Sequence, residues 1–292
     1  MCDEDTVTES EDYLARNSGM GRRDFNKMAI GAAAFMMLPP VANALDVVGS
    51  DVMVNTPDGT SDCYYVHPAK GKHPGVIIWP DILGLRPAFR MMGERLAKSG
   101  YSVLVVNPYY RSARSPVIEP GASFQDAETR NKVMPYYRAL SAETNVTDAK
   151  AYVAYLDQQK AVDVKRKIGT TGYCMGGPMV MRTAAAIPER IGAVGSFHGG
   201  GLVTDQPDSP HLLIKHMKAD LLIAVAANDD ERAPNDKEVL RKTFADAGLK
   251  AEVEVYKGAM HGWCPPDSRV YHEQQAEHAW SRLLVTFDRA LG

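Results

Sequence analysis

Short apolar segments alternate with longer amphipathic segments along most of this chain, and that alternation constrains its fold more than any other feature. The apolar segments are 75–79 (GVIIW), 102–106 (SVLVV), 167–171 (KIGTT), 193–197 (AVGSF), 221–226 (LLIAVA) and 251–256 (AEVEVY). Runs of this kind are typical of strands inside a parallel sheet that is covered on both faces. We therefore predict an α/β fold with a mostly parallel, twisted sheet.

Helical patterns fill the intervals between the predicted strands. They cover residues 87–99, 134–159, 175–187, 235–247 and 271–291. Pro87 suits a first helical turn, and Gly100 and Gly248 suit helix ends. Two strands around the turn at 57–59 are expected to form an opening hairpin. In folds of this class, helices cover both faces of the sheet and ligands bind at the carboxyl ends of the strands.

The first 44 residues have the features of a leader segment. GRRDFNKM at 21–28 precedes an apolar run at 28–38 and the small-residue site Ala42-Asn43-Ala44. This pattern is typical of a twin-arginine signal, and the apolar run is shorter than the ~20 residues that span a bilayer. We predict export to the periplasm by the twin-arginine machinery, cleavage after Ala44 and no stable membrane span. A disordered tail or an interfacial anchor is the alternative. Residues 45–292 would then form a single domain.

Charge and cysteine content narrow the range of functions. The chain has 33 Lys and Arg against 36 Asp and Glu, so nothing favours binding to nucleic acid or to an anionic membrane. After removal of the leader, Cys63, Cys174 and Cys264 remain. Their spacing fits neither a disulfide framework nor a metal site. We expect no metal and no cofactor.

The sequence GYCMGG at 172–177 follows a predicted strand and opens a predicted helix. It fits the Gly-x-nucleophile-x-Gly turn of hydrolases, with Cys174 in the place of serine. Gly172 and Gly176 leave room for a tight turn, and a helix N-terminus favours a thiolate. The alternative is a buried structural cysteine in a glycine-rich turn.

Two later loops supply the partners that such a nucleophile needs. In α/β-hydrolases the chain order is nucleophile, acid, histidine. Asp229 and Asp230 follow the fifth predicted strand, and His261 lies in the loop after the sixth. We predict a triad of Cys174, His261 and Asp229, with Asp230 as the alternative acid. His261 would take the thiol proton, and the acid would fix its tautomer.

Backbone donors and a substrate pocket are also expected near Cys174. The N–H groups of Met175 and of Ile82, in the loop WPDILGL, are the predicted oxyanion hole. Tyr110 and Trp263 are candidates for an apolar pocket lining, with core packing as the alternative. His198 and His211 are expected to form hydrogen bonds within loops.

Together these residues resemble the dienelactone hydrolase family, which carries a Cys-His-Asp triad on an α/β-hydrolase fold. The resemblance runs from about residue 75 to the C-terminus and includes GYCMGG, NPYYR, SFHGGGL, SPHLL, AANDD and GAMHGW. It implies a carboxymethylenebutenolidase-like enzyme that cleaves a carboxylic ester or lactone. It further implies that Asp81 contacts the resting cysteine. It also implies that Arg111 helps to hold a substrate carboxylate, although Arg111 could equally pair with a neighbouring acid.

One position departs from the family pattern. Pro265 stands where the family has a second carboxylate-binding arginine, and Arg269 lies nearby in the sequence. This departure favours a small ester or lactone of unspecified acyl group over dienelactone itself. The leading hypothesis is therefore an exported hydrolase that acts through a thioester on Cys174. In the alternative, Cys174 is a redox or covalent capture site without turnover, and Cys264 is a candidate for disulfide exchange.

Overall fold

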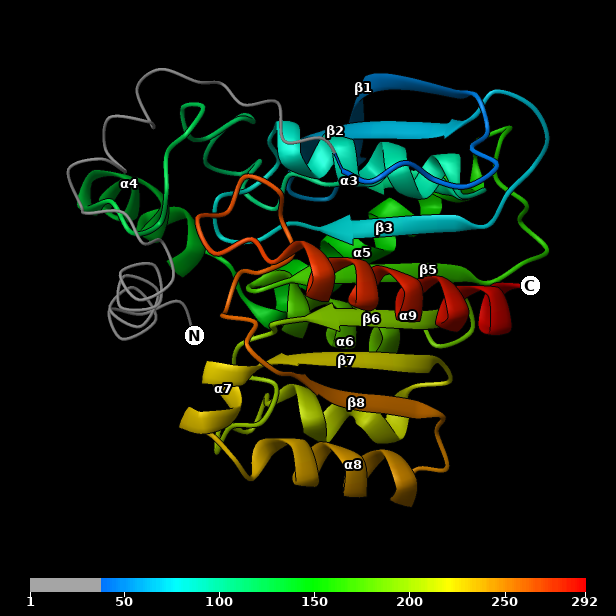
Figure 1. Cartoon of the computed structure of the whole chain (residues 1–292). Helices are drawn as coiled ribbons and strands as arrows, with labels where there is room; N and C mark the ends of the chain where they lie inside the picture. Colours follow the sequence, from blue (N-terminus) through cyan, green and yellow to red (C-terminus); the bar gives the residue numbers. More distant parts are fainter. Residues whose placement is uncertain (1–37) are drawn as a thin grey trace.

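The computed structural model describes residues 38–292, which form a single eight-stranded sheet between two layers of helices (Figure 1). The strands are β1 (Val47–Thr56), β2 (Gly59–Pro68), β3 (Gly75–Trp79), β4 (Ser102–Val105), β5 (Ile168–Tyr173), β6 (Ile191–Phe197), β7 (Asp220–Ala226) and β8 (Ala251–Tyr256). Their order is β1-β2-β4-β3-β5-β6-β7-β8. β2 pairs antiparallel with β1 and β4, and the strands from β4 to β8 run parallel. This architecture confirms the predicted α/β-hydrolase class of fold.

Seven α-helices and one 3₁₀ helix are described within this range. They are α3 (Pro87–Lys98), α4 (Ala127–Arg138), α5 (Ala142–Asp157), α6 (Gly176–Ala186), η1 (Pro210–His216), α7 (Ala227–Arg232), α8 (Asp236–Asp246) and α9 (Glu273–Leu291). α3 and α9 cover one face of the sheet, where the core includes Phe89 and Phe287. α5, α6 and α8 cover the other face, where the core includes Tyr152, Val180 and Phe244.

Neighbouring residues of one strand contribute to the two different cores. In β3, Ile77 packs under α5 and α6, whereas Val76 and Ile78 pack under α3 and α9. Alternate side chains of a strand point to opposite faces, so a strand that is covered on both sides must be apolar throughout. This is the reason why GVIIW could be recognised as a strand from its sequence.

Two helical segments differ from the prediction. The helix expected over 134–159 is interrupted, because α4 ends at Arg138 and α5 begins after Ser141. Ser141 caps α5 by accepting a hydrogen bond from the N–H of Thr144, whose side chain accepts from the N–H of Ser141 in return. The second difference is α7, a short helix that was not predicted and that carries both candidate acids.

Within the described part of the chain, no helix combines the length and apolar character needed to cross a bilayer. The arginine pair and most of the apolar run of the predicted export signal fall in residues 1–37, outside the described residues. The parallel strands end on the side of the molecule where α4 and α7 lie (Figure 1). The candidate site is found at this edge.

Candidate active site

Cys174 occupies a strained turn between β5 and α6. Its φ of 53° lies in the left-handed region, which non-glycine residues rarely adopt. A Cβ on Gly172 would lie 2.2 Å from the Gly176 carbonyl oxygen, and a Cβ on Gly176 would lie 2.3 Å from the Trp79 carbonyl oxygen. The turn is therefore as tight as the glycine pattern predicts, and it holds the cysteine at the edge of the sheet.

His261 is fixed by two residues in the first turn of α7, Asn228 and Asp229. Its Nδ1 lies 2.7 Å from Oδ2 of Asp229, and its backbone N–H donates to Oδ1 of Asn228 at 2.8 Å. Asp230 instead pairs with Lys237 at 2.6 Å. Of the two candidate acids, the structure therefore joins Asp229 to the histidine. Since Nδ1 is bound to the acid, Nε2 is the nitrogen available to exchange a proton with the thiol.

Asp229 and Cys174 control the protonation of His261. Burial disfavours the imidazolium, but the charges of Asp229 and Cys174, together with hydrogen bonds to both, raise the pKa of His261 to about 10. Burial also acts to raise the pKa of Asp229, but the charge of His261 and their hydrogen bond lower it below its usual value. The protonation states of Cys174, His261 and Asp229 are therefore coupled to one another.

This coupling makes the free energy of unfolding depend on pH. The pKa of His261 is about 10 in the folded protein and about 6.5 in an unfolded chain. Because the charge of Cys174 contributes to this shift, the folded site pairs an imidazolium with a thiolate, and below about pH 8.5 the thiol proton of the unfolded chain offsets the proton on His261. We expect the free energy of unfolding to fall mainly between about pH 8.5 and pH 10, by up to ~1.4 kcal/mol per pH unit, as the unfolded thiol loses its proton while His261 keeps its own. Urea unfolding at each pH measures the slope.

The two neighbouring acids give a matched control for this effect. Asp229→Asn should flatten the slope, because the amide cannot stabilise the imidazolium by its charge. Asp230→Asn should leave the slope as in the wild type, since this carboxylate pairs with Lys237. An unchanged slope in Asp229→Asn would contradict the assignment of the proton to His261.

His198 lies in the site, although it was expected only to form a hydrogen bond within its loop. It is buried, has a φ of 40°, and its ring centroid lies 5.1 Å from that of His261. Burial lowers the pKa of His198, so it is neutral at physiological pH. Trp263 packs against its other side, with ring centroids 5.0 Å apart. The sequence signal that could have identified it is its position directly after β6, at the same edge of the sheet as Cys174.

Both predicted oxyanion donors belong to segments that adjoin Cys174. Met175 directly precedes α6, and Ile82 lies in the loop after β3. Tyr109 connects them, because its hydroxyl donates to the Ile82 carbonyl oxygen at 2.8 Å and lies 3.2 Å from Sδ of Met175. Both residues also line the space around the nucleophile. Their placement fits the predicted role without testing it.

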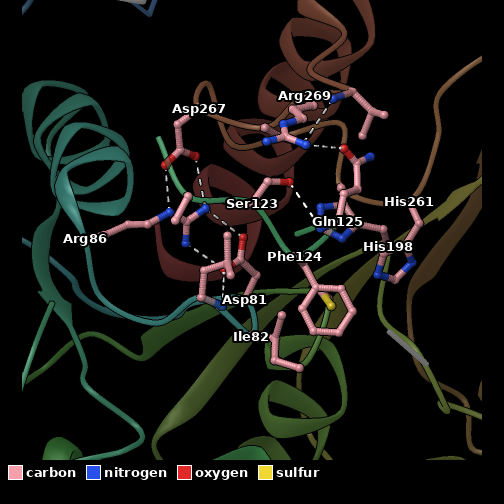
Figure 2. Close-up of a pocket in the computed structure, with 16 residues that line it drawn as sticks. Asp81, Ile82, Arg86, Ser123, Phe124, Gln125, His198, His261, Asp267 and Arg269 are labelled. Atoms are coloured by element: carbon pink, nitrogen blue, oxygen red, sulfur yellow. Dashed lines mark hydrogen bonds and ion pairs between the residues drawn. The ribbon is translucent and has the colours of Figure 1, made fainter. Parts of the chain in front are cut away.

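One cavity opens on the His261 side of Cys174 (Figure 2). We call it the histidine-side cavity; its lining includes Asp81, Ile82, Arg86, Phe124, Gln125, Cys174, His198, His261, Asp267 and Arg269. Asp81 lies there as predicted, but both its oxygens accept from Arg86, at 2.6 and 2.9 Å. Arg86 also binds Asp267, at 2.7 and 3.0 Å. Arg86, which the sequence analysis did not single out, therefore holds the acid that was expected to face the thiol.

A second cavity opens on the opposite side of Cys174, and the sequence analysis did not anticipate it. We call it the helix-side cavity because α4, α5 and α6 all contribute to its wall. Its lining comprises Ile82, Tyr137, Arg138, Leu140, Ser141, Ala142, Asn145, Cys174, Met175, Pro178, Met179, Arg182, Gly200 and Asp208. Cys174 and Ile82 border both cavities, so the nucleophile and a predicted oxyanion donor stand between them.

Three residues predicted to bind substrate lie outside both cavity linings. Arg111 pairs with Asp148, at 2.7 and 2.8 Å, and with Asp58 at 2.5 Å, which is the alternative considered for it. Tyr110 also donates to Asp148, at 2.8 Å. Trp263 is fully buried, in keeping with core packing. Arg269, in contrast, lines the histidine-side cavity and pairs with Asp126 at 3.0 Å.

The described residues contain no cluster of His, Cys, Asp and Glu that could hold a metal ion. Cys63, Cys174 and Cys264 are buried, and none of them forms a disulfide in the described part of the chain. Cys264 lies under α9 beside another, smaller cavity and does not line either cavity at Cys174. The arrangement can therefore support nucleophilic chemistry by a thiol, a histidine and a carboxylate.

Comparison with known proteins agrees with this fold. The model of the dienelactone hydrolase family matches residues 61–291. A "Putative carboxymethylenebutenolidase" of Synechocystis sp. is 28% identical over 227 residues, which cover 76% of this chain and 89% of that protein. The carboxymethylenebutenolidase of Rhodococcus opacus is 24% identical over 245 residues, covering 82% and 91%.

The fold also matches solved structures. The crystal structure of a "Putative Dienelactone Hydrolase" from Klebsiella pneumoniae superposes with a TM-score of 0.72 at 21% identity, over 84% of this chain and 99% of that one. The family match spans most of the chain, and relatives carry the names carboxymethylenebutenolidase and lactonase. The chain therefore belongs to the dienelactone hydrolase family and is a hydrolase of esters or lactones.

Proposed function

We propose that the protein hydrolyses a carboxylic ester or lactone through a thioester on Cys174. The observation that carries this proposal is the 2.7 Å contact between His261 and Asp229, which leaves the other ring nitrogen to serve the cysteine in the strained turn. A buried structural cysteine would not need a histidine whose tautomer is fixed by a carboxylate. The electrostatic coupling of Cys174 with His261 supports the same conclusion.

In the resting site the thiol proton is already held on Nε2 of His261, in keeping with the raised pKa of this ring. The thiolate attacks the ester carbonyl carbon, and the carbonyl oxygen becomes an oxyanion that the N–H groups of Met175 and Ile82 stabilise. When the C–O bond breaks, the leaving oxygen takes the proton from His261 and a thioester remains. Water then attacks the thioester and gives its proton to His261, and the acid leaves as the pair of thiolate and imidazolium is restored.

This order of reaction steps assigns one cavity to each half of the substrate. The leaving oxygen must receive a proton from Nε2 of His261, so the alcohol portion belongs in the histidine-side cavity. The helix-side cavity shares Cys174 with it, but His261 is absent from its described lining. The acyl portion therefore belongs in the helix-side cavity. In a lactone, the two portions are joined and the ring spans Cys174.

Rapid acid quenching during turnover of p-nitrophenyl acetate tests the thioester directly. We expect intact mass spectrometry to show the addition of one acetyl group, and peptide mapping to place it on Cys174. Turnover with the acetyl group on another residue would contradict the proposal. A stable adduct on Cys174 without release of acetate would instead support covalent capture without hydrolysis.

A further inference from the structure

The lining of the helix-side cavity includes buried polar atoms that have no hydrogen-bond partner among the described residues. Asn145, in α5, lines the cavity and is only 3% exposed. Neither its Oδ1 nor its Nδ2 has a hydrogen-bond partner among the described residues. Buried amides are normally paired, because an unpaired one costs free energy that a residue such as leucine would not. The position of Asn145 therefore indicates a partner that enters through the cavity.

Arg182, in α6, lines the same cavity, and its positive charge is only weakly neutralised by nearby carboxylates. Its side chain is 17% exposed, and its Nε has no hydrogen-bond partner among the described residues. The carboxylate paired with it belongs to the exposed Asp208, 3.7 Å away, which is beyond hydrogen-bond distance. Burial lowers the pKa of Arg182, which shows that its surroundings compensate its charge incompletely.

The arginines of the histidine-side cavity differ in this respect. Arg86 makes close contacts with two carboxylates, Asp81 and Asp267, and Arg269 pairs with Asp126 at 3.0 Å. Their charges are already matched by acids of the chain. The helix-side cavity, with Arg138 and Arg182 against Asp208 alone, has an excess of positive charge. An anionic group of the substrate is therefore favoured on the helix side of Cys174 and not on the histidine side.

We propose that the helix-side cavity is a carboxylate subsite for the acyl portion of the substrate. In this proposal, which rests on the proposed function, the carboxylate pairs with Arg182 and accepts a hydrogen bond from Nδ2 of Asn145. The apolar stem between this carboxylate and the reacting carbonyl packs on Met175 and Met179, which line the cavity and are mostly buried. The substrate class is thus the half-ester of a dicarboxylic acid.

Two esters with the same leaving group test the subsite. They are p-nitrophenyl hydrogen glutarate, whose acyl chain ends in a carboxylate, and p-nitrophenyl hexanoate, whose chain ends in a methyl group. We expect the wild type to have the higher kcat/KM for the glutarate ester. Arg182→Met should lower the glutarate-to-hexanoate ratio of kcat/KM by about 10- to 100-fold, because it removes a charge-assisted contact.

Arg241, in α8, provides a matched control, because it is an arginine on the same face of the sheet that lines neither cavity at Cys174. Arg241→Met removes the same charge from the chain, and we expect it to change the ratio by less than about threefold, since water screens a partly exposed guanidinium outside the cavity. Asn145→Leu should lower the ratio and also raise the Tm by about 2–4 °C, because it removes the unpaired buried amide. A merely structural role for Asn145 predicts the opposite change in Tm.

Binding of the free acids separates failure of this proposal from failure of the proposed function. In the Cys174→Ala protein, glutarate should raise the Tm more than hexanoate does, and Arg182→Met should remove the difference. If hexanoate esters are turned over but the glutarate ratio does not depend on Arg182, the subsite is wrong and the hydrolase stands. If neither ester is hydrolysed, the proposed function is wrong, and the thermal shift with glutarate alone decides the subsite.

Discussion

Cys174→Ala should abolish ester hydrolysis, with kcat/KM for p-nitrophenyl acetate falling at least about 10⁴-fold. Alanine removes the only atom in the turn that can form the thioester, whereas the buried volume changes little. Cys174→Ser keeps an attacking oxygen but gives a much weaker acid than the thiol. We therefore expect it to retain a small part of the activity, about 10²- to 10³-fold below the wild type.

Cys264→Ala is the matched control for this loss, because Cys264 is also buried but does not line either cavity at Cys174. Its rate should stay within about threefold of the wild type. Initial rates should be accompanied by circular dichroism spectra, which report whether each variant is folded. Wild-type rates in folded Cys174→Ala protein would refute the role of the thiol.

Asp229→Asn should give the second large loss, about 10²- to 10⁴-fold in kcat. The carboxylate accepts the Nδ1 proton of His261 at 2.7 Å, which leaves Nε2 free to accept the thiol proton. An asparagine amide can donate to Nδ1, and the ring is then held with its proton on Nε2. In this tautomer His261 cannot act as the base, although the geometry of the site is nearly unchanged.

Asp230→Asn tests whether this loss is specific to one of two adjacent carboxylates. Asp230 pairs with Lys237 and has no described hydrogen bond to His261, so its variant should keep kcat within about threefold of the wild type. The kcat of both variants should be measured across a range of pH. If Asp230→Asn lost more activity than Asp229→Asn, the acid would have been assigned incorrectly.

Much of the site can be predicted from the sequence, because the order of strands along the chain indicates which loops lie at the same edge of an α/β sheet. Parallel strands end at one edge, so a cysteine after β5, an acid after β7 and a histidine after β8 must lie near one another. The glycines around Cys174 were equally informative, since the turn leaves no room for a Cβ on either side. Local chemistry and topology therefore point to the same residues.

The remaining features depend on contacts that the sequence does not reveal. Arg111 stands at the position in the NPYYR motif where the family has a substrate-binding arginine. Its charge is matched by Asp148, which is distant in the sequence and lies next to Arg111 only in the folded protein. Asn145 and Arg182 look like ordinary residues of two helices. Their significance lies in buried polar atoms that have no hydrogen-bond partner among the described residues, which only the folded structure reveals.

The position of Cys174 between two cavities has an evolutionary consequence. Loops provide the wall on the His261 side, whereas the helices α4, α5 and α6 provide half of the lining residues on the other side. Loops accept insertions and substitutions more readily than packed helices do. Descendants of this enzyme could thus change the alcohols they accept by small edits to surface segments, while a new preference for acids would require repacking of the protein interior.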